Sequence, residues 1–318
     1  MYNGQYGGNF SEGIRQGLKN SFRKGSSLTR LIYINCGIFL VLKILYILVL
    51  LMGQGENFYN TLLEWIGVPA DVEYLLSRPW TLFTYMFTQF EFLHLLFNML
   101  WLYWFGNIFL NYFTERKLTG VYILGGLAGA LLYIAAYNTF PYFNEPQMSP
   151  FPQAPLRLSS WAIGSSASVM AIVFAVCTYI PQQKIYIFLI GPVKLIYLAI
   201  FTALIDILSI QHGNAGGHIA HLGGAIFGWF FILGIRRNRD LASGIVNFFE
   251  KIARLFLPRK KMRVKYKKKV SNMNDREYNE YKKHQSEQIN EILDKISKSG
   301  YESLTREEKE ILFRSGRN

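Results

Sequence analysis

The chain has 318 residues, of which 51% are hydrophobic and 16% aromatic, and it carries a formal net charge of +13 at pH 7. The apolar residues gather between Leu31 and Ile235, which excludes an ordinary water-soluble globular domain. The two cysteines, Cys36 and Cys177, lie in apolar runs and exclude a disulfide framework or a CxxC metal site.

Six apolar stretches are long enough to cross a bilayer, which takes about 20 residues per helix. In chain order they cover residues 31–52, 92–113, 118–137, 161–180, 185–210 and 217–235. Residues 53–91 are also apolar, but Pro69 and Pro79 interrupt them. We expect an interfacial segment there and not a seventh span. The sequence therefore predicts an all-α, polytopic membrane protein.

Basic residues set the orientation, because cytoplasmic loops carry an excess of Lys and Arg. Five precede the first span, Arg116 and Lys117 follow the second, and Lys184 follows the fourth. The other three loops hold only Arg78 and Arg157. We expect both termini to be cytoplasmic, in the inner (plasma) membrane of a bacterium. The predicted parts are an N-terminal segment 1–30, a membrane domain 31–235 and a basic tail 236–318 with 22 Lys and Arg against 12 Asp and Glu.

Polar side chains inside a span are costly, so each one is a hypothesis of function. The spans hold these: Lys43, His94, Asn98, Ser165, Ser166, Ser168, Lys194, Asp206, His218 and His221. At 1.5 Å of rise per residue, Ser166 lies roughly 8 Å and His221 roughly 6 Å from the outer ends of their spans. His94 and Asn98 share one face near the outer end of the second span. A serine, a histidine and two further polar groups at one depth are typical of an activated nucleophile with an oxyanion site.

Small residues favour close packing of the fourth and sixth spans. The serine lies in a run of Gly and Ala, and Gly224 and Gly228 follow the histidine four residues apart. Such spacing lets membrane helices approach closely. We expect this packing to bring Ser166 and His221 within hydrogen-bond reach.

Three short motifs occur in one order along the chain: HLLFN at 94–98, GSSA at 164–167 and AHLGGAIFG at 220–228. In this order they resemble the motifs of the rhomboid intramembrane serine proteases, and RPWTLFTYMF at 78–87 resembles the external loop of that family. The resemblance covers about residues 30–235. It implies a bundle of six transmembrane helices, followed here by a polar, partly helical tail. It also implies a serine endopeptidase that cleaves transmembrane segments of membrane proteins near the extracytoplasmic face.

The resemblance also implies the roles of single residues. Ser166 would be the nucleophile and His221 the general base of a dyad. Asn98, His94 and the backbone N–H of Ser166 would form the oxyanion hole. No cofactor and no metal is implied.

Two departures from the family pattern lie close to the serine. Ala167 replaces the usual glycine, and Met170 stands where an aromatic residue often packs on the catalytic imidazole. Ala167 is still a small residue, so the turn should be retained, and a methionine can still pack on an imidazole ring. We therefore expect a modified activity and not its loss. The neighbouring Ser165 and Ser168 are interpreted as a helix cap or as hydroxyls that bond the backbone.

Other polar residues leave alternatives open. Asp206 near the outer end of the fifth span either caps or bonds the sixth span, or relays protons. His218 lies one turn above His221, where we expect the water boundary. A zinc site would have to use His94, His212, His218 and His221, but no HExxH motif is present and two of these lie in or beside a glycine-rich loop, so we expect no metal.

Two other functions compete with the protease. A proteolytically silent rhomboid-like protein would bind or escort membrane clients, but such relatives typically lack the nucleophile or the base, and this chain has both. A transporter would show an inverted repeat with paired broken spans, which we do not find. Neither the oligomeric state nor the identity of the transmembrane substrates can be read from the sequence.

The tail has two distinct parts. Residues 258–269 read PRKKMRVKYKKK, a juxtamembrane segment that predicts binding to anionic lipid; we expect no nucleic-acid partner. Within about 275–314 the apolar residues recur at helical spacing, and Gly300 ends the first helix. A Thr-x-x-Glu capping box at Thr305 begins the second. We expect a small helical hairpin of unknown function.

Overall fold

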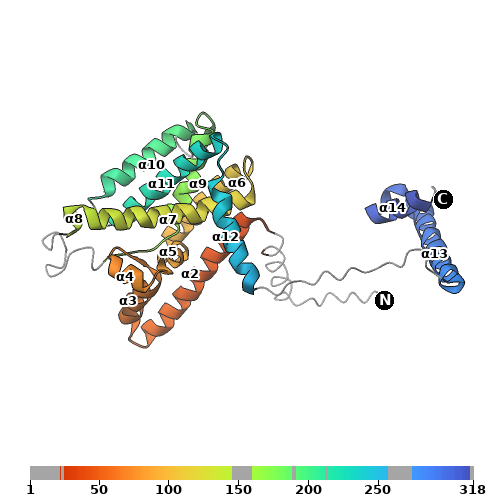
Figure 1. Cartoon of the computed structure of the whole chain (residues 1–318), viewed down its shortest axis with the longest axis horizontal. Coiled ribbons are helices and arrows are strands. Elements are labelled where there is room, and N and C mark those ends of the chain that lie inside the picture. Colours follow the sequence, from red (N-terminus) through yellow and green to blue (C-terminus); the bar gives the residue numbers. More distant parts are fainter. Residues whose placement is uncertain are drawn as a thin grey trace, which may run out of the picture. The chain divides into compact units, whose positions relative to one another are not determined.

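The computed structural model describes residue 22 and residues 25–144, 160–187, 191–211, 214–256 and 274–315. The chain divides into two compact units, Met1–Leu257 and Pro258–Asn318, and each is considered by itself. The first unit consists mainly of helices that pack side by side (Figure 1).

Helices occupy all six of the expected span regions. Four of them are long and apolar enough to cross a membrane: α2 (Ser27–Leu51), α6 (Phe92–Leu110), α7 (Glu115–Thr139) and α11 (Ala215–Arg236). Two are shorter apolar helices: α9 (Ser166–Tyr179) and α10 (Leu195–Ser209). The chain is therefore a polytopic helical membrane protein, and the number of six spans stays a prediction.

The fourth helix begins later than the sequence predicted. Residues 161–165 were expected to be helical, but Trp161–Ala162 form a short strand, β2. This strand pairs antiparallel with β1 (Val68–Pro69), so that Val68 lies opposite Ala162. The apolar run continues across the boundary, and hydropathy alone cannot separate an extended apolar segment from a helix. The chain therefore enters the bundle extended, and its helix begins at Ser166.

The fifth helix also begins later than predicted. Two antiparallel strands, β3 (Lys184–Ile187) and β4 (Gly191–Lys194), lie where the first turns of a span were expected. Pro192 cannot donate a helical hydrogen bond, and Gly191 has a φ of +92°, so both interrupt a helix. Lys194 consequently precedes α10 and does not lie in the middle of a span.

The segment between the first two long helices folds as short pieces. These are α3 (Gly55–Ile66), α4 (Val72–Ser77), α5 (Thr81–Thr84) and a 3-10 turn, η1 (Tyr85–Phe87). The rings of Trp65 and Trp80 stack with centroids 6.0 Å apart and stay half exposed. Amphipathic aromatic rings of this kind suit the headgroup level of a bilayer. Lys43 of α2 donates to the Phe90 carbonyl at the end of this segment, over 3.2 Å.

Three helices, α7, α9 and α11, form the centre of the bundle through small residues. The backbone of α11 at Gly224 and Gly228 lies directly against the carbonyl groups of Ala167 and Ala171 in α9. A Cβ atom at either glycine would collide with those carbonyl oxygens. This contact confirms the close packing that the Gly and Ala pattern predicted.

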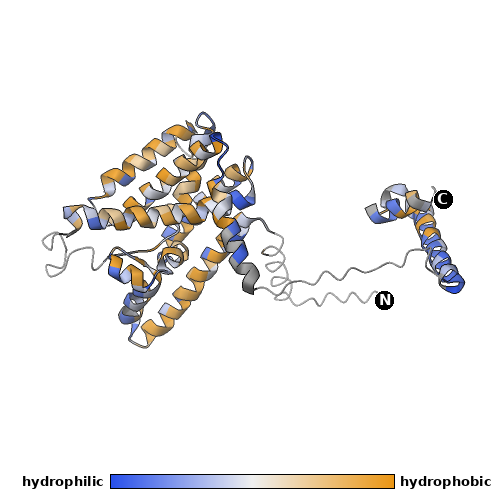
Figure 2. Cartoon of the chain, in the orientation of Figure 1, coloured by the Kyte–Doolittle hydropathy of each residue, from blue (hydrophilic) through white to orange (hydrophobic). Residues whose placement is uncertain are grey.

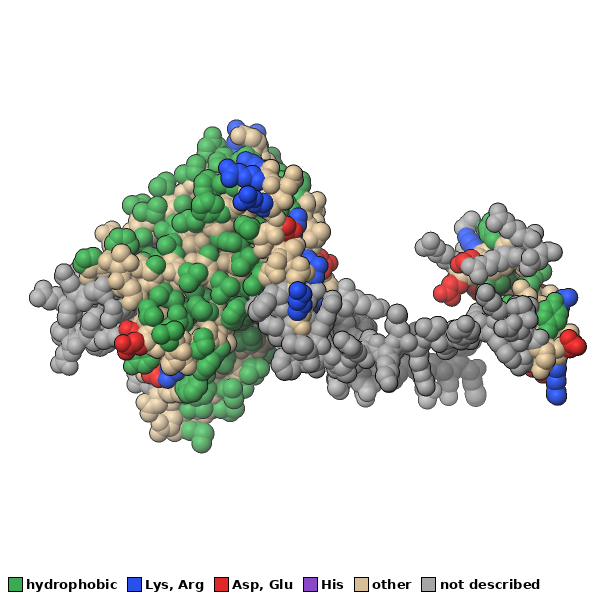
Figure 3. All heavy atoms as spheres, viewed as in Figure 1, with side chains coloured by type: hydrophobic (Ala, Val, Ile, Leu, Met, Phe, Trp, Pro, Cys, Tyr) green, Lys and Arg blue, Asp and Glu red, His purple; other side chains and the backbone are tan. Residues whose placement is uncertain are grey.

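The outer surface of the first unit is apolar. Hydrophobic residues run along the helices in Figure 2, and hydrophobic side chains are spread over the face of the first unit that Figure 3 shows. Residues such as Leu48 on α2 and Leu208 on α10 are exposed although they are large and apolar. Water-soluble monomers rarely expose contiguous apolar patches of this extent. An integral membrane protein exposes them to lipid.

Two short helices complete the first unit, α8 (Pro141–Asn144) and α12 (Leu241–Phe256). The start of α12 packs on α7, where Lys117 lies 3.6 Å from the Asp240 carboxylate and Ala242 covers Gly120. The polybasic stretch 258–269 lies outside the described residues.

The second unit is a pair of helices, α13 (Asp275–Ser299) and α14 (Arg306–Ser315), joined by a 3-10 turn, η5 (Tyr301–Ser303). Gly300 ends α13 with a φ of +79°. At the start of α14, Thr305 N–H donates to the Glu308 carboxylate over 2.7 Å, and Glu308 N–H donates to Thr305 Oγ1 over 3.3 Å. These reciprocal bonds are the two halves of a capping box.

Candidate active site

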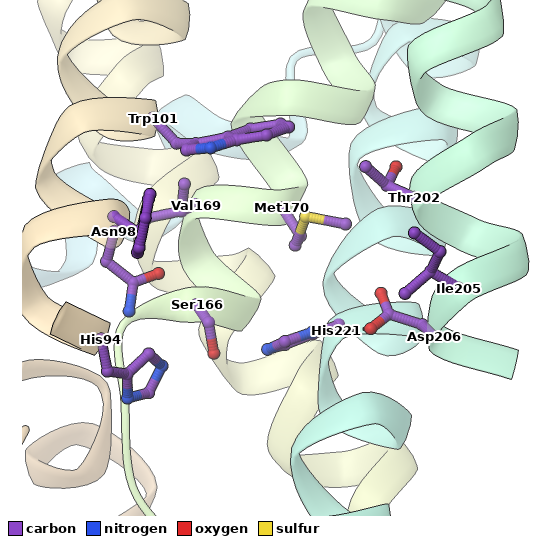
Figure 4. Close-up of a pocket in the computed structure, with 11 residues that line it drawn as sticks. His94, Asn98, Trp101, Ser166, Val169, Met170, Thr202, Ile205, Asp206 and His221 are labelled. Atoms are coloured by element: carbon purple, nitrogen blue, oxygen red, sulfur yellow. Dashed lines mark hydrogen bonds and ion pairs between the residues drawn. The ribbon is translucent and has the colours of Figure 1, made fainter. Parts of the chain in front are cut away.

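One cavity of about 260 Å³ brings the four predicted site residues together. It lies between α6, which carries His94 and Asn98, α9, which carries Ser166, and α10 and α11, the latter carrying His221 (Figure 4). The rest of its wall is mainly apolar: Phe97, Trp101, Val169, Met170 and Ile205. A small polar cluster in an apolar cavity is typical of a binding or catalytic site.

Ser166 takes its place from the extended strand that precedes it. The N–H of Gly164 donates to the Tyr85 carbonyl over 2.9 Å, which fixes the residues after the strand beside the 3-10 turn η1. Gly164 has a φ of +132°, and a Cβ atom there would lie 3.0 Å from His94 Cε1 and 3.5 Å from Ser166 Oγ. Only glycine suits this backbone and lets the His94 ring approach. The His94 imidazole and the Ser166 hydroxyl therefore both lie next to Gly164.

Ser166 is also the first residue of α9, with Ser165 at the N-cap position. The first N–H groups of a helix have no intrahelical acceptor, and the helix dipole is positive at this end. Ser166 Oγ therefore lies beside backbone donors that can stabilise a negative charge. In Figure 4 this hydroxyl lies between the rings of His94 and His221. Among the described residues, the side-chain hydrogen bond of His221 goes to Asp206 and none joins it to Ser166, so the expected bond between Ser166 and His221 is not formed in this structure.

Gln89, which no sequence pattern marked, holds Asn98. Asn98 Nδ2 donates to Gln89 Oε1 over 2.9 Å. Gln89 Nε2 in turn donates to Ser165 Oγ over 3.1 Å and to Asn35 Oδ1 over 3.3 Å. Gln89 is only 1% exposed, so these bonds are shielded from water. One amide hydrogen of Asn98 is used by Gln89, and the other is left for the cavity.

The same network continues away from the cavity. Asn35 Nδ2 of α2 donates to Tyr122 OH of α7 over 3.0 Å, and this hydroxyl donates to the Met86 carbonyl over 2.9 Å. Tyr85 OH donates to the Gly126 carbonyl. Asn35, a polar residue near the start of the first span, was a signal that could have revealed the network. Nothing in the local pattern marked Gln89, because it lies in the loop segment.

Asp206 joins the site from α10. It is 5% exposed, and its Oδ1 lies 2.9 Å from His221 Nδ1 and 2.8 Å from His218 Nδ1. Asp206 therefore bonds the sixth span region, one of the two roles left open by the sequence. His218 is half-buried and contacts this carboxylate but not the cavity, so the expectation of a residue merely at the water boundary missed its contact.

The other two serines of the GSSA region differ from expectation. Ser165 occupies the N-cap position but makes no capping bond, since its hydroxyl pairs with Gln89. Ser168 Oγ is buried next to Gly126 and has no hydrogen-bond partner within the described residues. Neither hydroxyl bonds the backbone as predicted, and neither lines the cavity.

Three side chains come close enough together to be considered for a metal ion. The ligand atoms of Asp206, His218 and His221 all lie within 4.8 Å of one another. The two hydrogen bonds to the carboxylate account for this cluster without an ion. Of the four histidines considered for zinc, His94 lies across the cavity on α6 and His212 lies outside the described residues.

Comparison with known proteins gives relatives of one kind. The chain is 30% identical over 164 residues to RHOMBOID-like protein 12, mitochondrial, of Arabidopsis thaliana, covering 51% of this chain and 48% of that protein. It is 28% identical over 184 residues to the human presenilin-associated rhomboid-like protein, mitochondrial, covering 52% and 41%. It is 24% identical over 148 residues to the rhomboid protease GlpG of Salmonella paratyphi A, covering 40% and 51%. The chain spans about half the length of the curated relatives it matches.

Family models match both units of the chain. Residues 274–316, which include the helices α13 and α14, match a family of unknown function, DUF6576. Residues 76–238 match the Rhomboid domain, and this stretch contains every residue of the cavity. The match covers more than half of the chain, and the three motifs lie within it in the expected order. The chain belongs to the rhomboid family.

Proposed function

We propose that this protein is an intramembrane serine endopeptidase that cleaves transmembrane segments of membrane proteins near their extracytoplasmic ends. The observation that carries the proposal is the cavity in which Ser166, His221, Asn98 and His94 meet. Membership of the rhomboid family supports it, because the family includes the protease GlpG.

The first half of the reaction would transfer the acyl part of the substrate to the serine. Ser166 Oγ attacks the carbonyl carbon of the scissile bond while His221 Nε2 takes the hydroxyl proton. The tetrahedral intermediate collapses, the C–N bond breaks, and His221 returns the proton to the leaving amine. An ester between Ser166 and the substrate remains.

The charge of the tetrahedral intermediate would be held by three donors. These are the free amide hydrogen of Asn98, a ring N–H of His94 and the backbone N–H of Ser166 at the start of α9. Donors fixed in advance in a site of low dielectric constant stabilise an oxyanion more strongly than water does. The Gln89 bond to Asn98 and the packing of His94 on Gly164 fix two of them in place.

The second half would release the acyl group by hydrolysis. A water molecule gives a proton to His221 Nε2 and attacks the ester carbonyl, and the same donors hold the second oxyanion. The ester C–O bond breaks, His221 returns the proton to Ser166 Oγ, and the product leaves as a carboxylic acid. The overall reaction consumes one water and needs no cofactor.

The apolar wall of the cavity fits a substrate segment from the membrane. Side chains such as Trp101, Val169 and Ile205 offer it no charged partner. A helical substrate hides its carbonyl groups in its own hydrogen bonds, so the segment must unwind before Ser166 can reach one. Substrates would therefore be transmembrane segments whose outer ends unwind easily.

We further propose that the protein lies in the inner membrane of a bacterium with both termini in the cytoplasm. The charge bias of the loops supports this orientation. The tail segment 258–269 would bind anionic lipid there. A reporter fused after Asn318 should be cytoplasmic, and an external signal would overturn the topology. Because two of the relatives are named mitochondrial, fractionation of the source cells distinguishes the two membranes.

The experiment compares the wild type with Ser166→Ala and Ser168→Ala in detergent or liposomes. We expect wild type and Ser168→Ala to react with a fluorophosphonate and to cleave a transmembrane reporter substrate, while Ser166→Ala does neither. Ser168 is a matched control on the same helix because its hydroxyl is buried outside the cavity. A folded wild type that neither labels nor cleaves would instead support the proteolytically silent rhomboid-like protein.

A further inference from the structure

The Asp206 carboxylate is buried at a position where a charge is expensive. It lies on a membrane helix, and its hydrogen-bond partners within the described residues are the two imidazoles of α11. A buried carboxylate without a strong partner is destabilising, and ionisable residues inside membrane helices are functional by default. Both imidazoles form their hydrogen bond with the same oxygen atom, Asp206 Oδ1.

This contact decides which nitrogen of His221 carries the proton. A carboxylate accepts hydrogen bonds and cannot donate them, so Nδ1 of His221 must be the N–H. The neutral ring then has its lone pair on Nε2, the nitrogen on the other side of the ring. Figure 4 shows the His221 ring between Asp206 and Ser166. Only this tautomer can accept the proton of the Ser166 hydroxyl.

From this geometry we propose that Asp206 is a positioning residue for His221, which makes the site a Ser166–His221–Asp206 triad. The inference rests on the proposed function. When Ser166 gives its proton to His221, the ring becomes a cation 2.9 Å from the carboxylate. The attraction between opposite charges at this distance is large in a site of low dielectric constant. The Asp206 carboxylate would stabilise the imidazolium that forms.

His218 completes the arrangement as a support for Asp206. It lies three residues before His221, so the two rings share one face of α11 and reach the same carboxylate. Its Nδ1–H bond holds Asp206 from a second side. The carboxylate is thereby tied to two successive turns of α11 although it belongs to α10.

The first measurement is kinetic. In the full chain, Asp206→Asn should lower kcat on a transmembrane reporter by about 10²-fold or more and leave KM within about threefold, because the amide can favour the wrong tautomer and brings no charge. The rate constant of fluorophosphonate labelling should fall in parallel. Asp240→Asn is the matched control, since Asp240 lies at the start of α12 near Lys117 and outside the cavity, and should keep the wild-type rate.

The second measurement reads the tautomer without any turnover. In ¹⁵N-histidine protein carrying Ser166→Ala, the His221 signals, assigned by their loss in His221→Gln, should report a proton on Nδ1. Asp206→Asn should shift the population toward the Nε2–H form. A merely structural role would not move this equilibrium.

The outcomes separate this inference from the proposed function. A folded Asp206→Asn variant with the wild-type kcat and an unchanged tautomer would overturn the triad and leave a dyad protease. If the wild type itself neither labels nor cleaves, the proposed function fails. The tautomer measurement then still decides whether Asp206 positions His221.

Discussion

The helices that surround the cavity pack in two different ways. The pair α9 and α11 is held by direct contact of backbones at Gly224 and Gly228. By contrast, α10 has three buried residues, Leu195, Ala199 and Asp206, and turns most of its large side chains outward. Ser166 and His221 therefore lie on the tightly packed pair, while Asp206 comes from the peripheral helix.

This difference separates the contacts that hold the helices together from the contacts that orient single side chains. The separation of the helices that carry Ser166 and His221 depends on backbone contacts that side-chain motion cannot alter. In the proposed triad, the orientation of the His221 ring depends on the Asp206 carboxylate, which comes from a helix with little other packing. A change in α9 or α11 should therefore damage the fold and the site together, whereas a change at the polar supports should damage the rate alone.

The largest effect should come from placing a side chain in the backbone contact between α9 and α11. Gly228→Val would drive a side chain into the Ala171 carbonyl and should cost about 3 kcal/mol or more, at or above the usual range for overpacked cores. Thermal unfolding in detergent measures the loss. Gly37→Val is the matched control, because nothing lies within 4 Å of a Cβ atom there and Gly37 is on the outer helix α2. Equal unfolding temperatures for the two variants would show that the tight pair is not what holds the bundle.

The next effect tests the oxyanion side of the cavity. Asn98→Ala should lower kcat by about 10²- to 10³-fold, the usual loss for one donor, because the His94 and backbone donors remain. The unfolding temperature should change far less than in Gly228→Val. Steady-state cleavage of a reporter substrate measures the rate. Wild-type turnover in a folded Asn98→Ala protein would remove Asn98 from the site.

A smaller effect should follow when Asn98 stays and only its support is removed. Gln89→Leu leaves the Asn98 amide free to rotate and should lower kcat about tenfold, the equivalent of one buried hydrogen bond. KM should stay close to that of the wild type in the same assay. The exposed Gln183, which pairs with Tyr112 outside the cavity, gives the control Gln183→Leu. If both variants behave alike, Gln89 does not orient Asn98.

The smallest effect concerns an ion pair in water, in contrast to the buried Asp206 cluster. Hydrogen bonds from the Lys295 ammonium and from Thr305 N–H lower the pKa of Glu308 below its ordinary value of 4.5. A lowered pKa in the folded state stabilises the helical pair above pH 4.5, and this stability is lost as the pH falls through the folded value. The protection factors of the α14 amides in the full chain, which are corrected for the pH dependence of intrinsic exchange, should therefore fall at low pH. Lys295→Met should weaken this dependence, and an identical pH profile in that variant would contradict the pairing.

The sequence predicted the membrane class, the order of the helices and the residues that meet in the cavity. These features could be predicted because the length of an apolar run and the spacing of small residues can be recognised within a short stretch of sequence. It misplaced the starts of the fourth and fifth helices, because an apolar strand such as Trp161–Ala162 has the same hydropathy as a helix. Gln89 escaped notice because its partners are 9, 54 and 76 residues away, and no local pattern records such contacts. The contact of Asp206 with both histidines depends on how α10 packs, which sequence spacing does not fix.

The short length of α9 has a consequence for the lipid around it. Its 14 residues measure about 21 Å along the axis, against about 30 Å for the hydrocarbon layer of a bilayer. A helix that is too short is accommodated by local thinning of the bilayer, at a cost of fractions of a kcal/mol per Å. Such thinning would bring the aqueous phase down to Ser166, at the very end of the helix. Access of water to Ser166 and the strain on the surrounding lipid would then both come from the short α9. A thicker membrane would increase the mismatch and the strain, and would make it harder for water to reach Ser166.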